Sequence, residues 1–278
     1  MKTDHPIITS RKNPLVMETA ALHEKKHRNK SRSFLIEGEK LVAEAADIGL
    51  PFLRVFVAES RSADFFREIA PRFSSPMYEA LPIYILNDDC FSKISSEKAP
   101  QGVIGVLKHL DFFERMTIIY DEDIFELREK RLLILSGIQD PGNLGAIIRS
   151  AVAFGTEVIF LSEDCADLYN SKTVRAAMGS LFRIRTVVVE DMASLVSALR
   201  HDGCRVLAAE LRPGAVALGE AALTARDVIV IGNEGHGIPP HLSSLCNASV
   251  YLPISKDAES LNAAVAASVF LWEQGKSK

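Results

Sequence analysis

Asn143 and Arg149 are the first residues whose type and spacing suggest chemistry. They follow the apolar run LLILSGI at 132–138, and the turn signal Asp-Pro-Gly separates them from it. Apolar residues then recur at helical spacing, so this segment predicts a strand, a loop and a helix. Gly145 and Ala146 are small, which leaves the guanidinium of Arg149 open to a bulky planar partner. Each residue also fits a structural role, Arg149 as an exposed helix arginine and Asn143 as a helix N-cap.

A glycine-rich loop, GNEGHG at 232–237, follows another apolar strand. Its glycines allow a ligand to approach the backbone closely, and Glu234 adds a carboxylate. The glycine spacing is not that of the dinucleotide fingerprint, and no Gly-Lys-Ser/Thr follows as in a P-loop. A plain glycine-rich turn is the structural alternative. We interpret His236 as a solvated loop residue and not as a general base.

The tripeptide Ser-Leu-Asn at 260–262 lies at the start of the last helix, which we predict over 259–274. It follows the strand end Leu-Pro-Ile at 252–254. Serine or asparagine at a helix start is commonly a cap, so each of these residues also has a structural explanation. The run AAVAAS at 263–268 gives the helix a surface of very small side chains. We therefore expect another element to pack closely against it.

The strands that precede these three segments are apolar throughout, which indicates burial on both faces and a mainly parallel sheet. Ligands in such sheets gather where loops leave the carboxyl ends of the strands. The three segments are therefore expected to converge. The strands predicted for this second domain lie at 132–138, 157–162, 184–189, 205–210, 227–232 and 249–254.

The N-terminal part, residues 1–112, predicts a separate small α/β domain. Residues 1–32 are helical and basic, residues 113–130 are interpreted as a linker, and the second domain covers 131–278. The lysines and arginines of 25–32 suit RNA phosphates, although a solvated helix face explains them equally well. The predicted strands of the first domain lie at 34–36, 51–59, 82–86 and 101–108, and its helices at 38–47, 63–70 and 88–95.

Bulk composition is that of a soluble globular protein, with 47% hydrophobic and 24% charged residues. The net charge of −4 does not favour nucleic acid, but a binding surface needs only a local basic field. The four cysteines lie far apart, so we expect reduced thiols and no metal site. The absence of a signal peptide or an apolar span predicts a cytoplasmic protein without membrane contact.

Together, the three segments resemble the motifs of the SpoU/TrmH family of SPOUT methyltransferases. The order and spacing of the motifs match over roughly 131–275, and Lys256 departs from the glycine that family members often carry there. The N-terminal stretches 8–16, 34–45 and 99–106 are similar to the family's RNA-binding domain, which resembles ribosomal proteins. The motif residues are Asn143, Gly145 and Arg149; Gly232, Glu234, Gly235 and Gly237; and Pro253, Ser260, Leu261 and Asn262.

The resemblance implies an enzyme that uses S-adenosylmethionine to methylate a ribose 2′-hydroxyl in RNA, with ribosomal RNA favoured. It also implies a trefoil knot in the second domain and a homodimer through the C-terminal helix. Arg149 would hold a phosphate and stabilise negative charge on the hydroxyl oxygen, because a guanidinium stays protonated. The catalytic set would be Arg149, Asn143, Glu234, Ser260 and Asn262. The cofactor would contact Leu211, Gly232, Asn233, Gly235, Gly237, Leu252, Ile254, Ser260 and Leu261. RNA would contact Arg11, Lys25, Lys26, Arg28, Lys30 and Arg32.

Two alternatives stay open from the sequence. The chain could be a catalytically silent RNA-binding or ribosome assembly factor of the same fold, which Lys256 favours and the complete motif set opposes. It could also act on transfer RNA. An ordinary nucleotide-dependent oxidoreductase is disfavoured by the missing dinucleotide fingerprint. Base methylation is disfavoured by the Asn/Arg pair, because it would need a different catalytic set.

Overall fold

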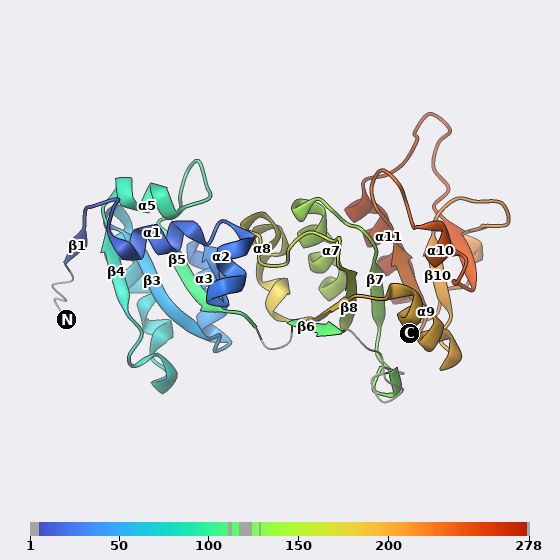
Figure 1. The fold of residues 1–278 in the computed structure, drawn as a ribbon, viewed down its shortest axis with the longest axis horizontal. Coiled ribbons are helices and arrows are strands. Elements are labelled where there is room, and N and C mark those ends of the chain that lie inside the picture. The colour runs from blue at the N-terminus through green and yellow to red at the C-terminus, as the bar shows by residue number, and fades with distance from the viewer. Residues whose placement is uncertain (1–5, 111–112, 117–123, 128, 277–278) are drawn as a thin grey trace. The chain divides into compact units, whose positions relative to one another are not determined.

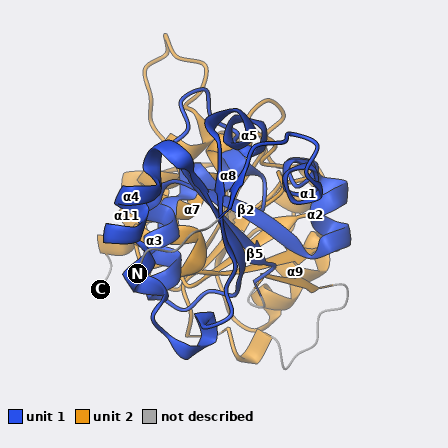
Figure 2. Cartoon of the chain, turned by 90° about the vertical axis from the view of Figure 1, so that its left-hand side faces the viewer, with its two compact units in different colours: residues 1–110, 169–179 blue, residues 111–168, 180–278 orange. Residues whose placement is uncertain are grey.

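The structure is a computed structural model that describes residues 6–110, 113–116, 124–127 and 129–276. Two compact units make up the chain, one of residues 1–110 and 169–179, the other of 111–168 and 180–278 (Figure 2). Our predicted division differs, because it placed 169–179 in the second domain. Helix α8 (Ser171–Ala177) contacts β2 (Ser33–Glu37) in the first unit, and the rings of Tyr169 and Phe34 lie 4.4 Å apart.

The first unit contains a five-stranded sheet in the order β1-β4-β3-β5-β2. Four of these strands, β1, β4, β3 and β5, are labelled in Figure 1. We had predicted all of the strands but β1, which adds an edge strand parallel to β4. One face of the sheet packs against α1 and α5 in a single apolar core. The remaining strands are β1 (Ile7–Ile8), β3 (Phe52–Ala58), β4 (Ile83–Leu86) and β5 (Val103–Lys108). The helices are α1 (Pro14–Ala21), α2 (Lys25–Ser31), α3 (Glu39–Asp47), α4 (Ser62–Glu68) and α5 (Asp88–Ile94), with 3-10 turns η1 (Glu59–Arg61), η2 (Ala70–Phe73) and η3 (Pro76–Tyr78).

The second unit contains an eight-stranded sheet in the order β11-β13-β10-β12-β7-β8-β9-β6, and every recorded strand pair is parallel. The predicted parallel sheet is therefore confirmed. Strand order does not describe threading, so the expected knot stays a prediction. The strands are β6 (Phe113–Met116), β7 (Leu132–Leu135), β8 (Val158–Ser162), β9 (Arg185–Val189), β10 (Val206–Ala209), β11 (Val216–Ala217), β12 (Val228–Ile231) and β13 (Ala248–Tyr251). The helices are α7 (Pro141–Ala153), α9 (Met192–His201), α10 (Pro240–Ser243) and α11 (Ala263–Lys276), with the 3-10 turn η5 (Leu218–Glu220). The 3-10 turn η4 (Met178–Phe182) spans the boundary between the two units in the sequence.

Strand β6 corrects our interpretation of 113–130 as a linker. It pairs with β9 along the edge of the sheet. Its residues are half-buried or exposed, and Glu114 receives two hydrogen bonds from Arg185 on β9, at 2.9 and 2.6 Å. An edge strand buries little apolar surface, so no apolar run marks it in the sequence.

Two layers of helices cover the second sheet. Side chains that alternate along β7, β8, β10 and β12 pack with α9 and α10 on one face. Helix α11 contacts both α7 and β12, which places α7 and α11 together on the opposite face. The close packing expected for the small-residue run of α11 is thus with α7. These helices position the segments that we singled out for chemistry.

Candidate functional site

A cavity of about 480 Å³ lies where β10, β12 and β13 end. Small-molecule sites occupy about 300–1,000 Å³, so the cavity is large enough for one cofactor. The loops after β12 and β13 line the cavity, and the loop after β7 is joined to them by hydrogen bonds of Asn143. This convergence is expected, since the carboxyl ends of parallel strands share one edge. Nine residues predicted to act on the cofactor or in catalysis lie on its wall: Leu211, Gly232, Asn233, Glu234, Gly237, Leu252, Ile254, Ser260 and Leu261.

Gly232 is required by close backbone packing inside the glycine-rich loop. A Cβ at this position would lie 2.4 Å from the carbonyl carbon of Gly237 and 2.5 Å from the nitrogen of Ile238. Asn233 closes the loop, exchanging two backbone hydrogen bonds of 3.0 Å with Gly237. Its side chain accepts from the backbone nitrogens of Gly235 and His236 and donates to the Gly137 carbonyl at 2.7 Å. The loop is therefore tied to the end of β7, while Gly235 itself does not line the cavity.

Three motif residues form a continuous hydrogen-bond chain. The Asn143 amide donates to a carboxylate oxygen of Glu234 at 2.8 Å, and its carbonyl oxygen accepts from the Asn262 amide at 2.9 Å. Both ends of the Asn143 side chain are thus fixed. Asp140, and not Asn143, caps α7, because its side chain accepts from the Asn143 backbone nitrogen at 2.9 Å.

Asn262 also caps α11, accepting from the backbone nitrogens of Ala264 and Val265 at 2.9 and 3.3 Å. The helix begins at Ala263, so our predicted start at Glu259 is four residues too early. The residues before Asn262 instead form the cavity wall. Asn262 therefore has two roles: its side-chain oxygen caps α11, and its side-chain nitrogen donates to Asn143.

Arg149 is exposed on α7 and does not line the cavity of its own chain. It has no hydrogen bond or ion pair with the described residues. At about 100° per residue, it lies some 120° around the helix from Asn143. Ser150 lies on the side toward α11, where its hydroxyl is 2.7 Å from that of Ser268. The role that the resemblance implies for Arg149, at the attacking hydroxyl oxygen, is thus not placed at the cavity of one chain and stays a prediction.

Sequence reasoning missed several residues of the cavity wall. Phe270 lies seven positions after Ala263 and four after Ala266, on the same side of α11, and all three line the cavity. Helical periodicity was the available signal for Phe270. Glu210 also lines the cavity, with one carboxylate oxygen accepting from Ser249 at 2.8 Å and from Ser243. Nearby, burial first and the Glu210 charge second raise the pKa of Cys246 to about 11, which keeps this thiol protonated.

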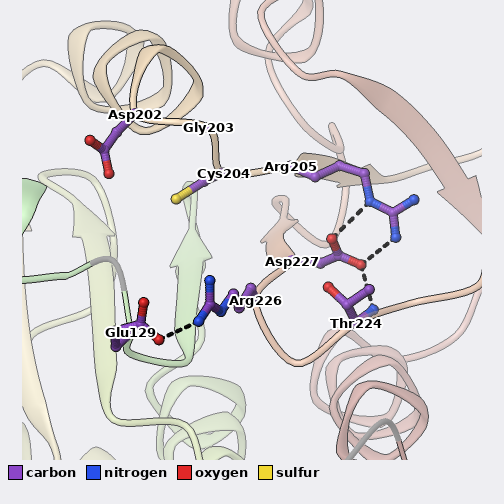
Figure 3. A pocket seen from close by; sticks show the side chains of 8 residues that line it. All are labelled: Glu129, Asp202, Gly203, Cys204, Arg205, Thr224, Arg226 and Asp227. Atoms are coloured by element: carbon purple, nitrogen blue, oxygen red, sulfur yellow. Dashed lines mark hydrogen bonds and ion pairs between the residues drawn. The ribbon is translucent and has the colours of Figure 1, made fainter.

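A second cavity, of about 580 Å³, lies at the amino ends of β10 and β12 (Figure 3). Both of its arginines are paired with carboxylates of the same wall. Arg205 donates to both carboxylate oxygens of the buried Asp227, and Arg226 pairs with Glu129. Because ligands of parallel sheets bind at the carboxyl ends, this cavity is not the candidate site.

The basic segment of the first unit divides into exposed and buried residues. Lys25, Lys26 and Lys30 of α2 are exposed and form no ion pair with the described residues. Arg28 is only 3% exposed, and its guanidinium donates to the carbonyls of Leu22 and His23 at 2.8 and 2.7 Å. Our prediction of Arg28 as an RNA contact is therefore wrong.

Two further arginines predicted to contact RNA are exposed. Arg11 forms an ion pair with Asp89 at 2.8 Å. Arg32 ends α2 in the left-handed conformation, with φ of 51°. Both side chains are open to solvent, unlike that of Arg28. Their prediction as RNA contacts therefore stays a prediction.

Comparison with known proteins agrees with this geometry. The SpoU rRNA Methylase family model matches residues 130–272, and the MRM3-like substrate binding domain matches 13–105. The 23S rRNA (guanosine(2553)-2'-O)-methyltransferase RlmP of Bacillus subtilis is 34% identical over 269 residues, covering 95% of this chain and 97% of that protein. The chain belongs to the SpoU rRNA methylase family. It is an RNA 2′-O-methyltransferase by this relationship, and the resemblance stated from the motifs is confirmed.

Other relatives support the same fold. The 23S rRNA (uridine(2479)-2'-O)-methyltransferase of Streptomyces viridochromogenes is 29% identical and covers 96% of this chain and 90% of that protein. An AdoMet-bound rRNA methyltransferase from Sinorhizobium meliloti superposes with a TM-score of 0.81 at 29% identity, covering 98% of this chain and 97% of that chain. No helix in the described part of the chain has the length and apolar character that a membrane crossing requires.

The cavity fits S-adenosylmethionine by its own chemistry. Ile231, Leu252 and Phe270 supply an apolar wall for a purine base. The backbone at Gly232 carries no side chain that would keep a ribose away. Carboxylates of Glu234 and Glu259 on the wall suit the positive charges of a sulfonium and an ammonium.

Proposed function

We propose that this protein transfers a methyl group from S-adenosylmethionine to a ribose 2′-hydroxyl of ribosomal RNA. The hydrogen-bond chain Asn262–Asn143–Glu234 carries this proposal, because it joins the three family motifs beside a cavity that fits the cofactor. The two 23S rRNA relatives act on a guanosine and a uridine, so the base is not part of the proposal.

When bound, the cofactor supplies a methyl group on a sulfonium that is already activated for in-line transfer. Asn143, fixed at both ends of its amide, orients the ribose near Glu234. Arg149 holds a neighbouring phosphate and stabilises the negative charge that grows on the attacking oxygen. The hydroxyl proton leaves through water, because the guanidinium is already protonated.

A homodimer through α11 is part of the proposal. Leu261, Val265 and Trp272 are exposed along one side of this helix and its start, with 40%, 50% and 50% of each residue accessible. Such a stripe of large apolar side chains suits an isologous interface. Because α7 packs against α11, a second copy would bring its own Arg149 toward the shared region.

The first unit supplies RNA docking. The exposed Lys25, Lys26 and Lys30 give a local positive field despite the net charge of −4. Its match to the MRM3-like substrate binding domain supports this role. A protein that modifies ribosomal RNA acts where ribosomes are assembled, so we place it in the cytoplasm.

The deciding experiment combines calorimetry and a methylation assay. The full chain should bind S-adenosylmethionine and transfer a tritiated methyl group to ribosomal RNA from cells that lack its gene, but not to RNA from cells that carry it. Cofactor binding without transfer to any RNA would support the silent assembly factor instead. Transfer to the tRNA fraction alone would support a tRNA enzyme.

A further inference from the structure

Lys256 lies between the strand end Leu252–Ile254 and the tripeptide Ser260–Asn262, on the wall of the cofactor cavity. It is exposed and forms no ion pair or hydrogen bond with the described residues. The side chain thus extends a cation to this rim without a recorded partner. That arrangement needs an explanation beyond the family match.

The turn around Lys256 is closed by its neighbours. The Ser255 hydroxyl donates to the Asp257 carboxylate at 3.1 Å and accepts from the Asp257 backbone nitrogen at 3.2 Å. The Ala258 nitrogen donates to the Ser255 carbonyl at 3.1 Å. The Asp257 carboxylate thus turns toward Ser255, and it forms no ion pair with Lys256 in the described part of the chain.

The charges on the wall point to what that anion is. Among the described lining residues, Lys256 is the only lysine or arginine, whereas Glu210, Glu234 and Glu259 are carboxylates. Glu210 pairs with Arg212 at 3.3 Å, so Glu234 and Glu259 supply the acidic character of the rim. S-adenosylmethionine carries two positive groups, a sulfonium and an ammonium, and one negative group, the methionine carboxylate. An acidic rim interrupted by one cation is complementary to that distribution.

We propose that Lys256 binds the carboxylate of the methionine moiety of S-adenosylmethionine and thereby selects cofactors that carry it. The proposal rests on the proposed function, because it requires the cavity to be the cofactor site. The base occupies the apolar wall of Ile231, Leu252 and Phe270, and the zwitterionic end stays at the polar rim beside Lys256.

The test compares two ligands that differ only in that carboxylate. Calorimetry on the full chain measures the dissociation constants of S-adenosylmethionine and of decarboxylated S-adenosylmethionine. Lys256→Gln should weaken the first by about ten-fold, since a partly exposed charge-assisted hydrogen bond is worth roughly 1.4 kcal/mol. The second should change by less than about two-fold, because the ligand lacks the interacting group. Lys256→Arg should keep most of the affinity for both.

Lys130→Gln is the control, because it removes a half-buried lysine that pairs with Glu157 at 3.8 Å, just before β7 and away from the cavity. It should change neither constant. Equal weakening of both ligands by Lys256→Gln would mean a disturbed loop and would overturn the proposal. Unchanged binding of S-adenosylmethionine by Lys256→Gln would also overturn the proposal, even if the affinity for RNA falls. Wild-type protein that binds neither ligand would instead refute the proposed function.

Discussion

Helices α2 and α7 each carry an arginine that the sequence marks as functional, and the structure treats the two in opposite ways. Arg28 on α2 is buried, with its guanidinium on two backbone carbonyls just after α1. Arg149 on α7 is exposed and forms no hydrogen bond or ion pair with the residues that the structure describes. A guanidinium that satisfies carbonyls contributes to stability, whereas one left open to solvent is available to a substrate. Residue type and local charge do not separate these cases, but burial does.

The largest expected effect is on Arg149. Arg149→Ala should lower the turnover rate by about 10²–10³-fold, the usual cost of removing one donor to a developing oxyanion. Affinity for S-adenosylmethionine should stay within a few-fold, because Arg149 does not line the cavity. Arg149→Lys should recover little activity if the phosphate contact is bidentate. Single-turnover kinetics and calorimetry measure the two quantities.

Mixed dimers sharpen this prediction. Chains with Arg149→Ala are combined with chains carrying Gly232→Ala, which should destroy the cavity through its backbone clash. If Arg149 acts across the interface, a mixed dimer has one complete site and regains activity. If it acts within its own chain, the mixture stays inactive. Full activity of Arg149→Ala by itself would remove Arg149 from the mechanism.

Arg28 should affect stability and not chemistry. Arg28→Ala leaves two carbonyls without their donor, and each buried unsatisfied group costs about 1–3 kcal/mol. We expect the free energy of unfolding of the first unit to fall by roughly 2–4 kcal/mol in urea titrations. Lys26→Ala, on the exposed side of the same helix, should change it by less than about 0.5 kcal/mol. Equal stability of the two variants would contradict the contrast drawn between buried and exposed charges.

The exposed lysines should affect RNA binding alone. Lys26→Gln with Lys30→Gln removes two charges from one side of α2, so RNA affinity should fall and its log–log dependence on salt should flatten by roughly 2. Filter binding over a range of salt concentrations measures this slope. Lys130→Gln is again the control. An unchanged slope would show that α2 is only a solvated helix face.

Arg32 should give the smallest effect. A non-glycine residue at φ of 51° is strained, so Arg32→Gly should raise the free energy of unfolding by about 0.5 kcal/mol or leave it unchanged. RNA affinity should still decrease a few-fold, because one exposed charge is lost. The test is whether Arg32→Gly preserves or raises the free energy of unfolding while it lowers RNA affinity. A loss of both would assign Arg32 to the fold.

The residues of the cavity wall could be predicted from the sequence because apolar strands and unusual loops are local patterns. One geometric rule, that the loops after parallel strands share one edge of the sheet, then brings them together. Apolar strands followed by unusual loops place those loops at one edge of a parallel sheet, and nine predicted residues line one cavity there. Gly232 and the cap at Asn262 are likewise marked by residue type. The sequence alone thus determined the sheet, the convergence of the loops and the family.

Only the tertiary structure decided which residues that are distant in the sequence contact each other. It buried Arg28 against carbonyls five and six residues away, placed β6 within the expected linker, and grouped 169–179 with the first unit. It also fixed both ends of Asn143 by partners 91 and 119 positions away, and left Arg149 outside its own cavity. Such pairings depend on burial and on contacts distant in the chain, and neither leaves a periodic pattern in the sequence around a residue.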